Sequence, residues 1–207
     1  MSSHKSKLVI IRHSESEWNA LGKWTGLSDA QLDQKGYHES IMMGQCLKDI
    51  RFDYAFCSEQ LRSLETLEGV LHSSKQADVH FERSSALNER DYGDYTGKNK
   101  AEIKELLGPP AFEVLRKGWN VPIPNGETLK MVYDRIVPYY FETVVPRLSR
   151  GENILIVSHA NAIRALVKYI ETITDEEIAN IDMVFGTALV YETDSSGKKL
   201  NKTIRSI

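Results

Sequence analysis

Short apolar runs alternate with longer segments of helical periodicity in the first half of the chain. Within residues 32–50 and 59–74, apolar side chains return at intervals of three and four, which predicts amphipathic helices, and Asp33 is placed to cap the first. The intervening runs are β-branched or aromatic and typical of buried parallel strands: they are KLVIIR at 7–12, FDYAFCS at 52–58 and NILIVSH at 153–159. We therefore expect an α/β fold, a three-layer sandwich whose mostly parallel central sheet has helices on both faces.

The second half of the chain has a long helical pattern at 128–151. Pro138 and Pro146 fall within it, and each removes a backbone N–H, so we expect the helix to be kinked or broken there. Gly151 should end it. Further expected elements are helices at 159–171 and 175–181 and a terminal hairpin of 188–194 and 199–207 around Ser195, Ser196 and Gly197.

Residues 84–126 have the least regular pattern. Four prolines lie there, at positions 109, 110, 122 and 124, and we expect this segment to form a lid-like insertion over the sheet. The C-terminal stretch GKKLNKTIRSI is basic, and we expect an edge strand there rather than a mobile tail that assists closure.

Composition limits the classes of partner. The chain has 207 residues, 41% of them hydrophobic, which favours one domain spanning 1–207. The formal charge of −3 gives no excess of cations that would recommend nucleic acid or an anionic membrane, so any anion site must be local. Cys46 and Cys57 lack the spacing of a disulfide scaffold, and the N-terminal segment MSSHKSK is polar, which together predict a cytoplasmic protein.

Histidine and arginine side chains are expected to meet where predicted strands end. His13 and His159 each follow a strand, and ligands of open α/β sheets bind beyond the carboxyl ends of strands. Arg12 adjoins His13, and Arg62 lies just past the end of the 52–58 strand. Arginine forks suit a doubly charged phosphoryl group, so the four residues predict a phosphate pocket. The alternative for either histidine alone is a half-buried, hydrogen-bonded residue; metal ligation is disfavoured because no His or Cys pair has ligand spacing.

Several longer motifs occur in order along nearly the whole chain. RHSESEWN at 12–19, WTG at 24–26, LNERDYGDYTGKNKAE at 87–102 and SHANAIRALVKYIE at 158–171 resemble the cofactor-dependent phosphoglycerate mutases of the histidine phosphatase superfamily. The resemblance implies that His13 is a nucleophile that takes a phosphoryl group. It further implies that Arg12, Arg62 and His159 surround the transferring oxygens, with His159 most effective when protonated, and that Glu89 exchanges the proton of the substrate hydroxyl.

The resemblance also implies cations that hold the rest of a phosphoglycerate. The expected substrate-binding residues are Asn19, Thr25, Gly26, Arg90, Tyr92, Lys100, Arg116, Lys117, Ala160 and Asn161. Simple phosphatases of the superfamily do not share this type of basic lid. Lys100 with the Arg116–Lys117 pair therefore favours a mutase.

Some positions depart from the family pattern. Ser14 and Ala160 stand where the family has glycine, and Ala162 replaces a serine. Lys117 replaces an arginine and loses its bidentate fork. Threonines of the family are replaced by Cys57 and Phe185. The chain is also shorter around PIPNGETL, in a region that often lies at a subunit contact, so either a monomer or a homodimer is expected.

Three functional hypotheses follow from the resemblance. The first is a mutase of glycolysis and gluconeogenesis that interconverts 3-phosphoglycerate and 2-phosphoglycerate through phospho-His13, primed by 2,3-bisphosphoglycerate and needing no metal. The second is a phosphatase of the same superfamily, in which water discharges phospho-His13 from a small phosphorylated metabolite. The third is a non-catalytic protein that binds a phosphometabolite.

Overall fold

A computed structural model describes residues 5–207, and it has the α/β architecture expected from the sequence. Its sheet has six strands in the order β3-β2-β4-β1-β5-β6. The strands are β1 (Ser6–Arg12), β2 (Tyr54–Cys57), β3 (Phe81–Arg83), β4 (Ile154–Ser158), β5 (Thr187–Thr193) and β6 (Lys199–Ser206). Pairing is parallel from β1 through β4 and β2 to β3, and antiparallel from β1 through β5 to β6. The first four residues of the polar N-terminal segment lie outside the described residues.

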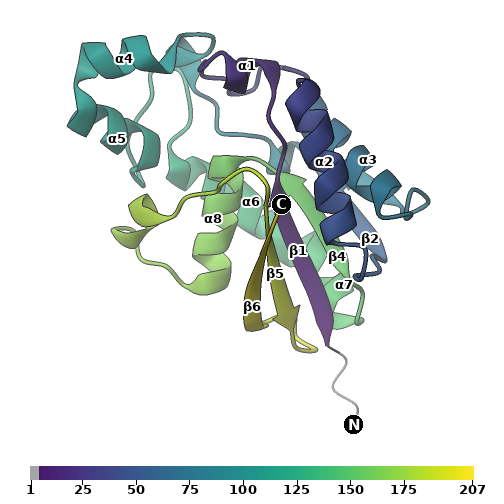
Figure 1. The fold of residues 1–207 in the computed structure, drawn as a ribbon. Helices are drawn as coiled ribbons and strands as arrows, with labels where there is room; N and C mark the ends of the chain where they lie inside the picture. Colours follow the sequence, from purple (N-terminus) through teal and green to yellow (C-terminus); the bar gives the residue numbers. More distant parts are fainter. Residues whose placement is uncertain (1–4) are drawn as a thin grey trace.

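Helices cover both faces of the sheet, as predicted for a three-layer sandwich (Figure 1). On one face, α2 (Gln34–Cys46) and α3 (Leu61–Ser73) enclose a core that includes Val9 and Ile11 of β1. On the other, α6 (Leu129–Tyr139) and α8 (Ala160–Glu171) pack with Leu8 and Ile10. The alternation follows from the twofold period of strand side chains. The predicted cap of α2 is confirmed, because the Asp33 carboxylate accepts from the backbone N–H of Gly36 at 2.7 Å.

The long helical pattern of the second half is interrupted between its two prolines, as predicted. Pro138 lies inside α6, a π-helical turn spans Tyr140–Val144, and Pro146 falls in the first turn of α7 (Val145–Ser149). A proline in a first helical turn removes an N–H that has no intrahelical acceptor, so the chain continues as a helix. Gly151 follows the helix end with φ of 84°, a backbone conformation that glycine adopts readily.

The segment 84–126 is more regular than the sequence pattern suggested. It forms α4 (Lys100–Leu107) and α5 (Pro109–Lys117), with 3-10 turns at Ser85–Leu87 and Gly93–Tyr95. Pro109 and Pro110 begin α5 rather than disrupting it, because its first turn needs no donors from them. In Figure 1, α4 and α5 lie with the short α1 (Glu17–Ala20) beyond the upper, carboxyl end of β1. This position agrees with a lid-like insertion.

The lid has a small apolar core of its own. Its buried members are Trp24, Tyr92, Ile103, Phe112, Leu115 and Ile123. The rings of Trp24 and Tyr92 meet edge to face with centroids 4.4 Å apart, a preferred aromatic geometry. This core is separate from the two that flank the sheet, so the lid is held as one packed unit.

Several remaining elements agree with the sequence pattern, and two short ones, α1 and β3, were not predicted. The β5–β6 hairpin and the edge position of β6 are confirmed, and α8 begins directly after His159. The short helix expected at 175–181 is a 3-10 turn, Glu177–Asn180. The three exposed residues of β3 had no predicted strand, because so short an edge strand shows no alternation of burial.

Candidate active site

The two strand-end histidines lie side by side, because β1 and β4 are parallel neighbours. Arg12 pairs with Ser158 in the ladder, and the backbone N–H of His13 donates to the Ser158 carbonyl at 2.8 Å. His13 and His159 therefore leave the sheet together, with ring centroids 4.9 Å apart. The sequence expectation that neighbouring strands bring the two histidines together is confirmed.

The His13 ring is buried and oriented by its neighbouring backbone. Its Nδ1 lies 2.7 Å from the Ser14 carbonyl, which can only accept, so Nδ1 carries the proton. Burial, followed by the positive charges of Arg62 and Arg12, holds the pKa of His13 well below its usual value. The ring is therefore neutral near pH 7, and Nε2 keeps a lone pair. This is the protonation state that a nucleophilic imidazole requires.

His159 is expected to act best when protonated, and its charge without ligand depends on its surroundings. Its Nε2 lies 2.7 Å from the Ser58 hydroxyl, and its Nδ1 is buried without a hydrogen-bond partner in the described residues. Burial lowers its pKa well below the usual value, and Arg62 and His13 lower it further. In the substrate-free protein His159 is thus neutral, not protonated. A bound phosphoryl dianion would oppose these effects and favour the protonated ring.

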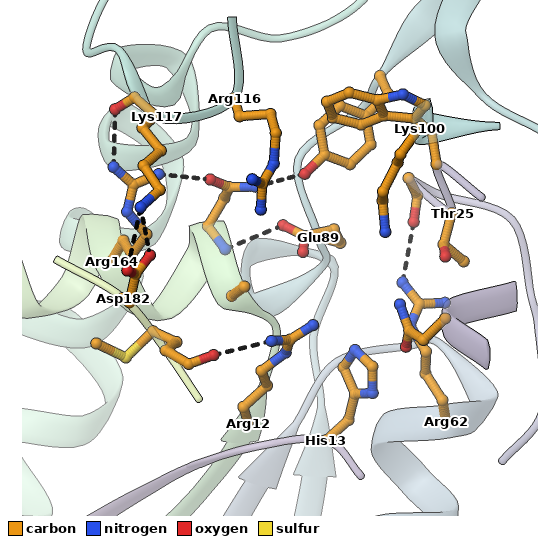
Figure 2. A pocket seen from close by; sticks show the side chains of 17 residues that line it. Arg12, His13, Thr25, Arg62, Glu89, Lys100, Arg116, Lys117, Arg164 and Asp182 are labelled. Atoms are coloured by element: carbon orange, nitrogen blue, oxygen red, sulfur yellow. Dashed lines mark hydrogen bonds and ion pairs between the residues drawn. The ribbon is translucent and has the colours of Figure 1, made fainter. Parts of the chain in front are cut away.

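Two arginines flank the histidines with different supports. Arg62, on α3, donates to the carbonyls of Ser28 at 2.8 Å and Gly26 at 3.0 Å, and burial lowers its pKa to about 10. Gly26 holds φ of 52°, so its carbonyl is presented by a turn that favours glycine. Arg12 donates to the Met183 carbonyl at 2.8 Å. Figure 2 shows Arg12, His13 and Arg62 side by side along the pocket floor.

Glu89 is buried at the pocket wall and held through its own backbone and carboxylate. Oε1 accepts from the backbone N–H of Arg90 at 2.7 Å and of Asn161 at 3.3 Å. The Glu89 N–H donates to Gln60 at 2.8 Å. These bonds join the 84–126 insertion to α3 and α8, so the carboxyl group has a fixed position above the floor (Figure 2).

A second group of cations lies on the lid. Lys100 begins α4, while Arg116 and Lys117 end α5. Burial lowers the pKa of Lys100 to about 8, with further lowering from Arg12 and Arg116. Lys117 forms an ion pair with Asp182 at 2.8 Å. The pocket therefore has cations at two levels, on the floor and on the lid, with Glu89 between them (Figure 2).

Arg164 was not predicted as a site residue, although it lies in the quoted SHANAIRALVKYIE motif. Its guanidinium donates to the Asn161 side-chain oxygen at 2.9 Å and to the Lys117 carbonyl at 2.7 Å. Asn161 in turn donates to the Tyr92 hydroxyl at 2.6 Å. Arg164 thus ties the end of α5 to the beginning of α8. Its place three residues after Asn161 puts both on one helix face, which was the available signal.

One pocket collects most of the predicted residues. The predicted residues that line it are Arg12, His13, Asn19, Thr25, Gly26, Arg62, Glu89, Tyr92, Lys100, Arg116, Lys117, Ala160 and Asn161. Trp24, Arg164, Asp182 and Met183 line it as well and were not predicted. His159 lies behind the lining, next to His13.

Arg90 is the predicted substrate-binding residue that the structure places elsewhere. Its buried guanidinium donates to the carbonyls of Glu127 at 2.6 Å, Leu115 at 3.2 Å and Val121 at 3.3 Å. It is not among the residues that line the pocket. Through these bonds Arg90 holds the lid against the segment that carries Glu89. The sequence did not reveal this role, because the acceptors are backbone carbonyls.

Most of the residues that depart from the family pattern are buried or line the pocket. Ser14 is buried, and its backbone N–H donates to the Thr66 hydroxyl at 3.0 Å. Ala162 packs in the core of the α6–α8 face, and Ala160 lines the pocket. Burial raises the pKa of Cys57 to about 12.

Buried polar atoms without partners concentrate at this site. Within residues 5–207, the buried side-chain nitrogen and oxygen atoms that lack a hydrogen bond are Nε of Arg12, Arg62 and Arg164, Nε1 of Trp24, Oγ1 of Thr25 and Nδ1 of His159. All but His159 belong to residues that line the pocket. Buried donors normally have a partner, and these groups can all donate. The site is therefore built to accept an anionic ligand with several oxygens.

Neither a metal site nor a membrane-spanning helix is found in the described part of the chain. No cluster of three or more His, Cys, Asp or Glu side chains there is arranged to hold a metal ion. No helix of residues 5–207 has both the length and the apolar character needed to cross a bilayer.

Comparison with known proteins gives consistent matches over the whole chain. Residues 8–204 match the family model described as histidine phosphatase superfamily (branch 1). A protein of Cytophaga hutchinsonii named 2,3-bisphosphoglycerate-dependent phosphoglycerate mutase is 40% identical, over 91% of this chain and 88% of its own. One of the same name from Parvibaculum lavamentivorans is 36% identical over 94% of both chains. A phosphoglycerate mutase of Schizosaccharomyces pombe is 36% identical over 95% of this chain and 94% of its own.

Solved structures share the fold at lower sequence identity. YhfR of Bacillus stearothermophilus superposes with a TM-score of 0.82 at 25% identity, covering 94% of each chain. A mycobacterial glucosyl-3-phosphoglycerate phosphatase superposes with a TM-score of 0.81 at 18% identity, covering 94% of this chain and 100% of its own.

Proposed function

This chain belongs to the histidine phosphatase superfamily, branch 1, and on that premise we propose that it is a 2,3-bisphosphoglycerate-dependent phosphoglycerate mutase. The reaction proposed is the interconversion of 3-phosphoglycerate and 2-phosphoglycerate, in the cytoplasm, as a step of glycolysis and gluconeogenesis. Relatives that carry this name and span nearly the whole chain support the proposal.

The concentration of unpartnered buried donors around His13 is the observation that carries the proposal. The floor supplies the Nε–H groups of Arg12 and Arg62 beside the neutral ring of His13. The lid supplies Lys100, Arg116 and Lys117 on the far side of Glu89. 3-Phosphoglycerate has an anionic group at each end and a hydroxyl between them, which matches this order of cation, carboxyl group and cation.

The same donors fit 2,3-bisphosphoglycerate. Arg12 and Arg62 would hold one phosphate, and the lid cations Lys100 and Arg116 would hold the other with the carboxylate. When bound, the molecule supplies the phosphoryl group that primes the enzyme. Burial lowers the pKa of Lys100 most, and the charges of Arg12 and Arg116 lower it further, so a polyanion bound between these cations would relieve their repulsion and favour the charged lysine.

The chain's own groups account for each step of the transfer. Nε2 of His13 forms the bond to phosphorus as the bond from phosphorus to the substrate oxygen breaks. Arg12 and Arg62 balance the charge on the equatorial oxygens, and His159 lies close enough to His13 to donate through its unpartnered Nδ1. Glu89 gives its proton to the departing substrate oxygen and takes one back when the neighbouring hydroxyl attacks phospho-His13.

Product analysis tests the proposal. Purified protein is mixed with 3-phosphoglycerate and a trace of 2,3-bisphosphoglycerate, and 2-phosphoglycerate and inorganic phosphate are followed by phosphorus NMR. The expected product is 2-phosphoglycerate, and activity should persist in EDTA. His13→Ala should abolish turnover and covalent labelling, while His80→Ala, at an exposed histidine, serves as the matched control. Inorganic phosphate as the sole product would refute the mutase proposal.

A phosphatase is the second candidate, and Asp182 is the observation that favours it. The Asp182 carboxylate lines the pocket and neutralises Lys117, so one lid cation is not fully available to a substrate carboxylate. A weaker hold on the substrate would leave phospho-His13 open to water. The NMR experiment separates the two, and unchanged ligand binding by His13→Ala without any labelling of the wild type would instead indicate the non-catalytic hypothesis.

A further inference from the structure

Phe185 contacts two residues of the site, Arg12 and His13. It belongs to the segment that links the 3-10 turn Glu177–Asn180 to β5. The centre of the Arg12 guanidinium lies 3.6 Å from the centroid of the Phe185 ring. The same ring meets His13 edge-on, with centroids 5.9 Å apart. Phe185 is not among the pocket-lining residues, so any influence on a ligand passes through Arg12 or His13.

Arg12 has fewer hydrogen bonds to hold it than Arg62 has. The Arg62 guanidinium donates to two carbonyls, those of Ser28 and Gly26, which fix both its position and its plane. Among the described residues, Arg12 donates one hydrogen bond, from Nη1 to the Met183 carbonyl, and its Nε is buried without a partner. A single hydrogen bond leaves the guanidinium free to turn about that contact. The Phe185 ring, whose centroid lies 3.6 Å from the guanidinium centre, limits this freedom.

We infer that Phe185 is a positioning residue, whose ring holds the plane of the Arg12 guanidinium so that its unpaired N–H groups face phosphoryl oxygens beside His13. A guanidinium stacks face to face on an aromatic ring, and the interaction strengthens when water is excluded. Arg12 and Phe185 are both half-buried, so water is partly excluded from their contact. The inference rests on the proposed function for its role in transfer, although its effect on phosphate binding does not.

Aromatic and aliphatic substitutions of Phe185 distinguish two roles for its side chain, filling space and orienting Arg12. If Phe185 only fills space, Phe185→Leu retains most of the apolar volume and Phe185→Tyr adds only a hydroxyl, so both variants should behave alike. If the π face orients Arg12, the tyrosine variant keeps the function and the leucine variant loses it. Phe141→Leu, at a phenylalanine with 59% of its surface exposed, is the matched control.

The test measures phosphate affinity and mutase kinetics for each variant. The dissociation constant of inorganic phosphate, measured by calorimetry, should rise roughly tenfold in Phe185→Leu and Phe185→Thr and stay within about twofold of wild type in Phe185→Tyr. The kcat for 2-phosphoglycerate formation should fall by a similar factor in the same two variants. Circular dichroism checks that each variant is folded, and Phe185→Met replaces the leucine variant if that one is not.

Two results would overturn the inference. One is equal phosphate affinity in wild type and Phe185→Leu, and the other is an equal loss in the tyrosine and leucine variants. Failure of the proposed function can be distinguished from failure of this inference. A wild-type protein that forms no 2-phosphoglycerate can still show the expected order of phosphate affinities among the variants. In that outcome the role of Phe185 stands and the mutase proposal does not.

Discussion

Lys100 is expected to set an alkaline limit on substrate capture. Its pKa is lowered to about 8, first by burial and then by the positive charges of Arg12 and Arg116. The protonated fraction of Lys100 in the free enzyme therefore falls from about 90% at pH 7 to about 10% at pH 9. The substrate phosphate is already dianionic throughout this range. Since the lysine loses its charge as the pH rises, kcat/KM should decline above pH 8.

The size of the decline follows from what the charge contributes. A hydrogen bond to a charged group contributes about 1.5–3 kcal/mol, which corresponds to roughly 10- to 150-fold in kcat/KM. Between pH 7 and 9 the loss of the protonated form alone gives about a tenfold decline. The kcat should vary less, because bound phosphoglycerate raises the pKa of Lys100 in the complex.

The assay is the pH profile of kcat/KM for 3-phosphoglycerate from pH 6.5 to 9.5 in wild type, Lys100→Arg and Lys100→Met. The arginine variant should lose the decline, because its side chain stays charged over this range. In the methionine variant, kcat/KM should be lower than in wild type and independent of pH over this range. Lys98→Arg, on the same segment but outside the pocket lining, should retain the wild-type profile. An alkaline decline that persists in Lys100→Arg would refute the assignment.

Further predictions concern stability and thiol chemistry. The pKa values of His13 and His159 are lowered in the folded protein, so the unfolded chain takes up protons first as the pH falls below 6.5. The unfolding free energy should therefore decrease by up to about 2.7 kcal/mol per pH unit between pH 6.5 and 5. In urea titrations His13→Asn should halve this slope, and an unchanged slope would contradict the assignment. Gly44→Ala should lower the unfolding free energy by about 1–3 kcal/mol, since an added Cβ would overlap Ser73 and Val70 of α3; a urea midpoint equal to wild type would argue against this packing. Burial raises the pKa of the Cys57 thiol to about 12, so a thiol reagent should modify Cys46 first in the native protein; labelling of Cys57 at an equal rate would be inconsistent with its burial.

The strands and the histidine pair were predictable because their signals are local. Three apolar runs, each followed by polar residues, specify buried parallel strands. The positions of the two histidines follow from where two of these strands end. The cap by Asp33 depends on a side chain and a backbone N–H three residues apart. Each of these features depends on neighbours in the sequence.

Features that depend on distant backbone groups were not predictable. The carbonyls of Met183 and Lys117 fix Arg12 and Arg164, and a carbonyl carries no signal in the sequence. The neutral state of His159 arises from burial beside two arginines, which requires the folded arrangement. The helix α5 was not predicted because its segment is short and rich in proline, whereas Pro109 and Pro110 mark the beginning of the helix.

The unpartnered donors of the pocket also tie the lifetime of the protein to its metabolites. Each such group lowers the free energy of unfolding in the empty state, and an anion that satisfies them binds only the folded chain. A ligand present at a hundred times its dissociation constant adds about 2.7 kcal/mol to the folded state. Without a bound anion, the protein unfolds more often and is more readily proteolysed. Its abundance would therefore follow the supply of its anionic ligand.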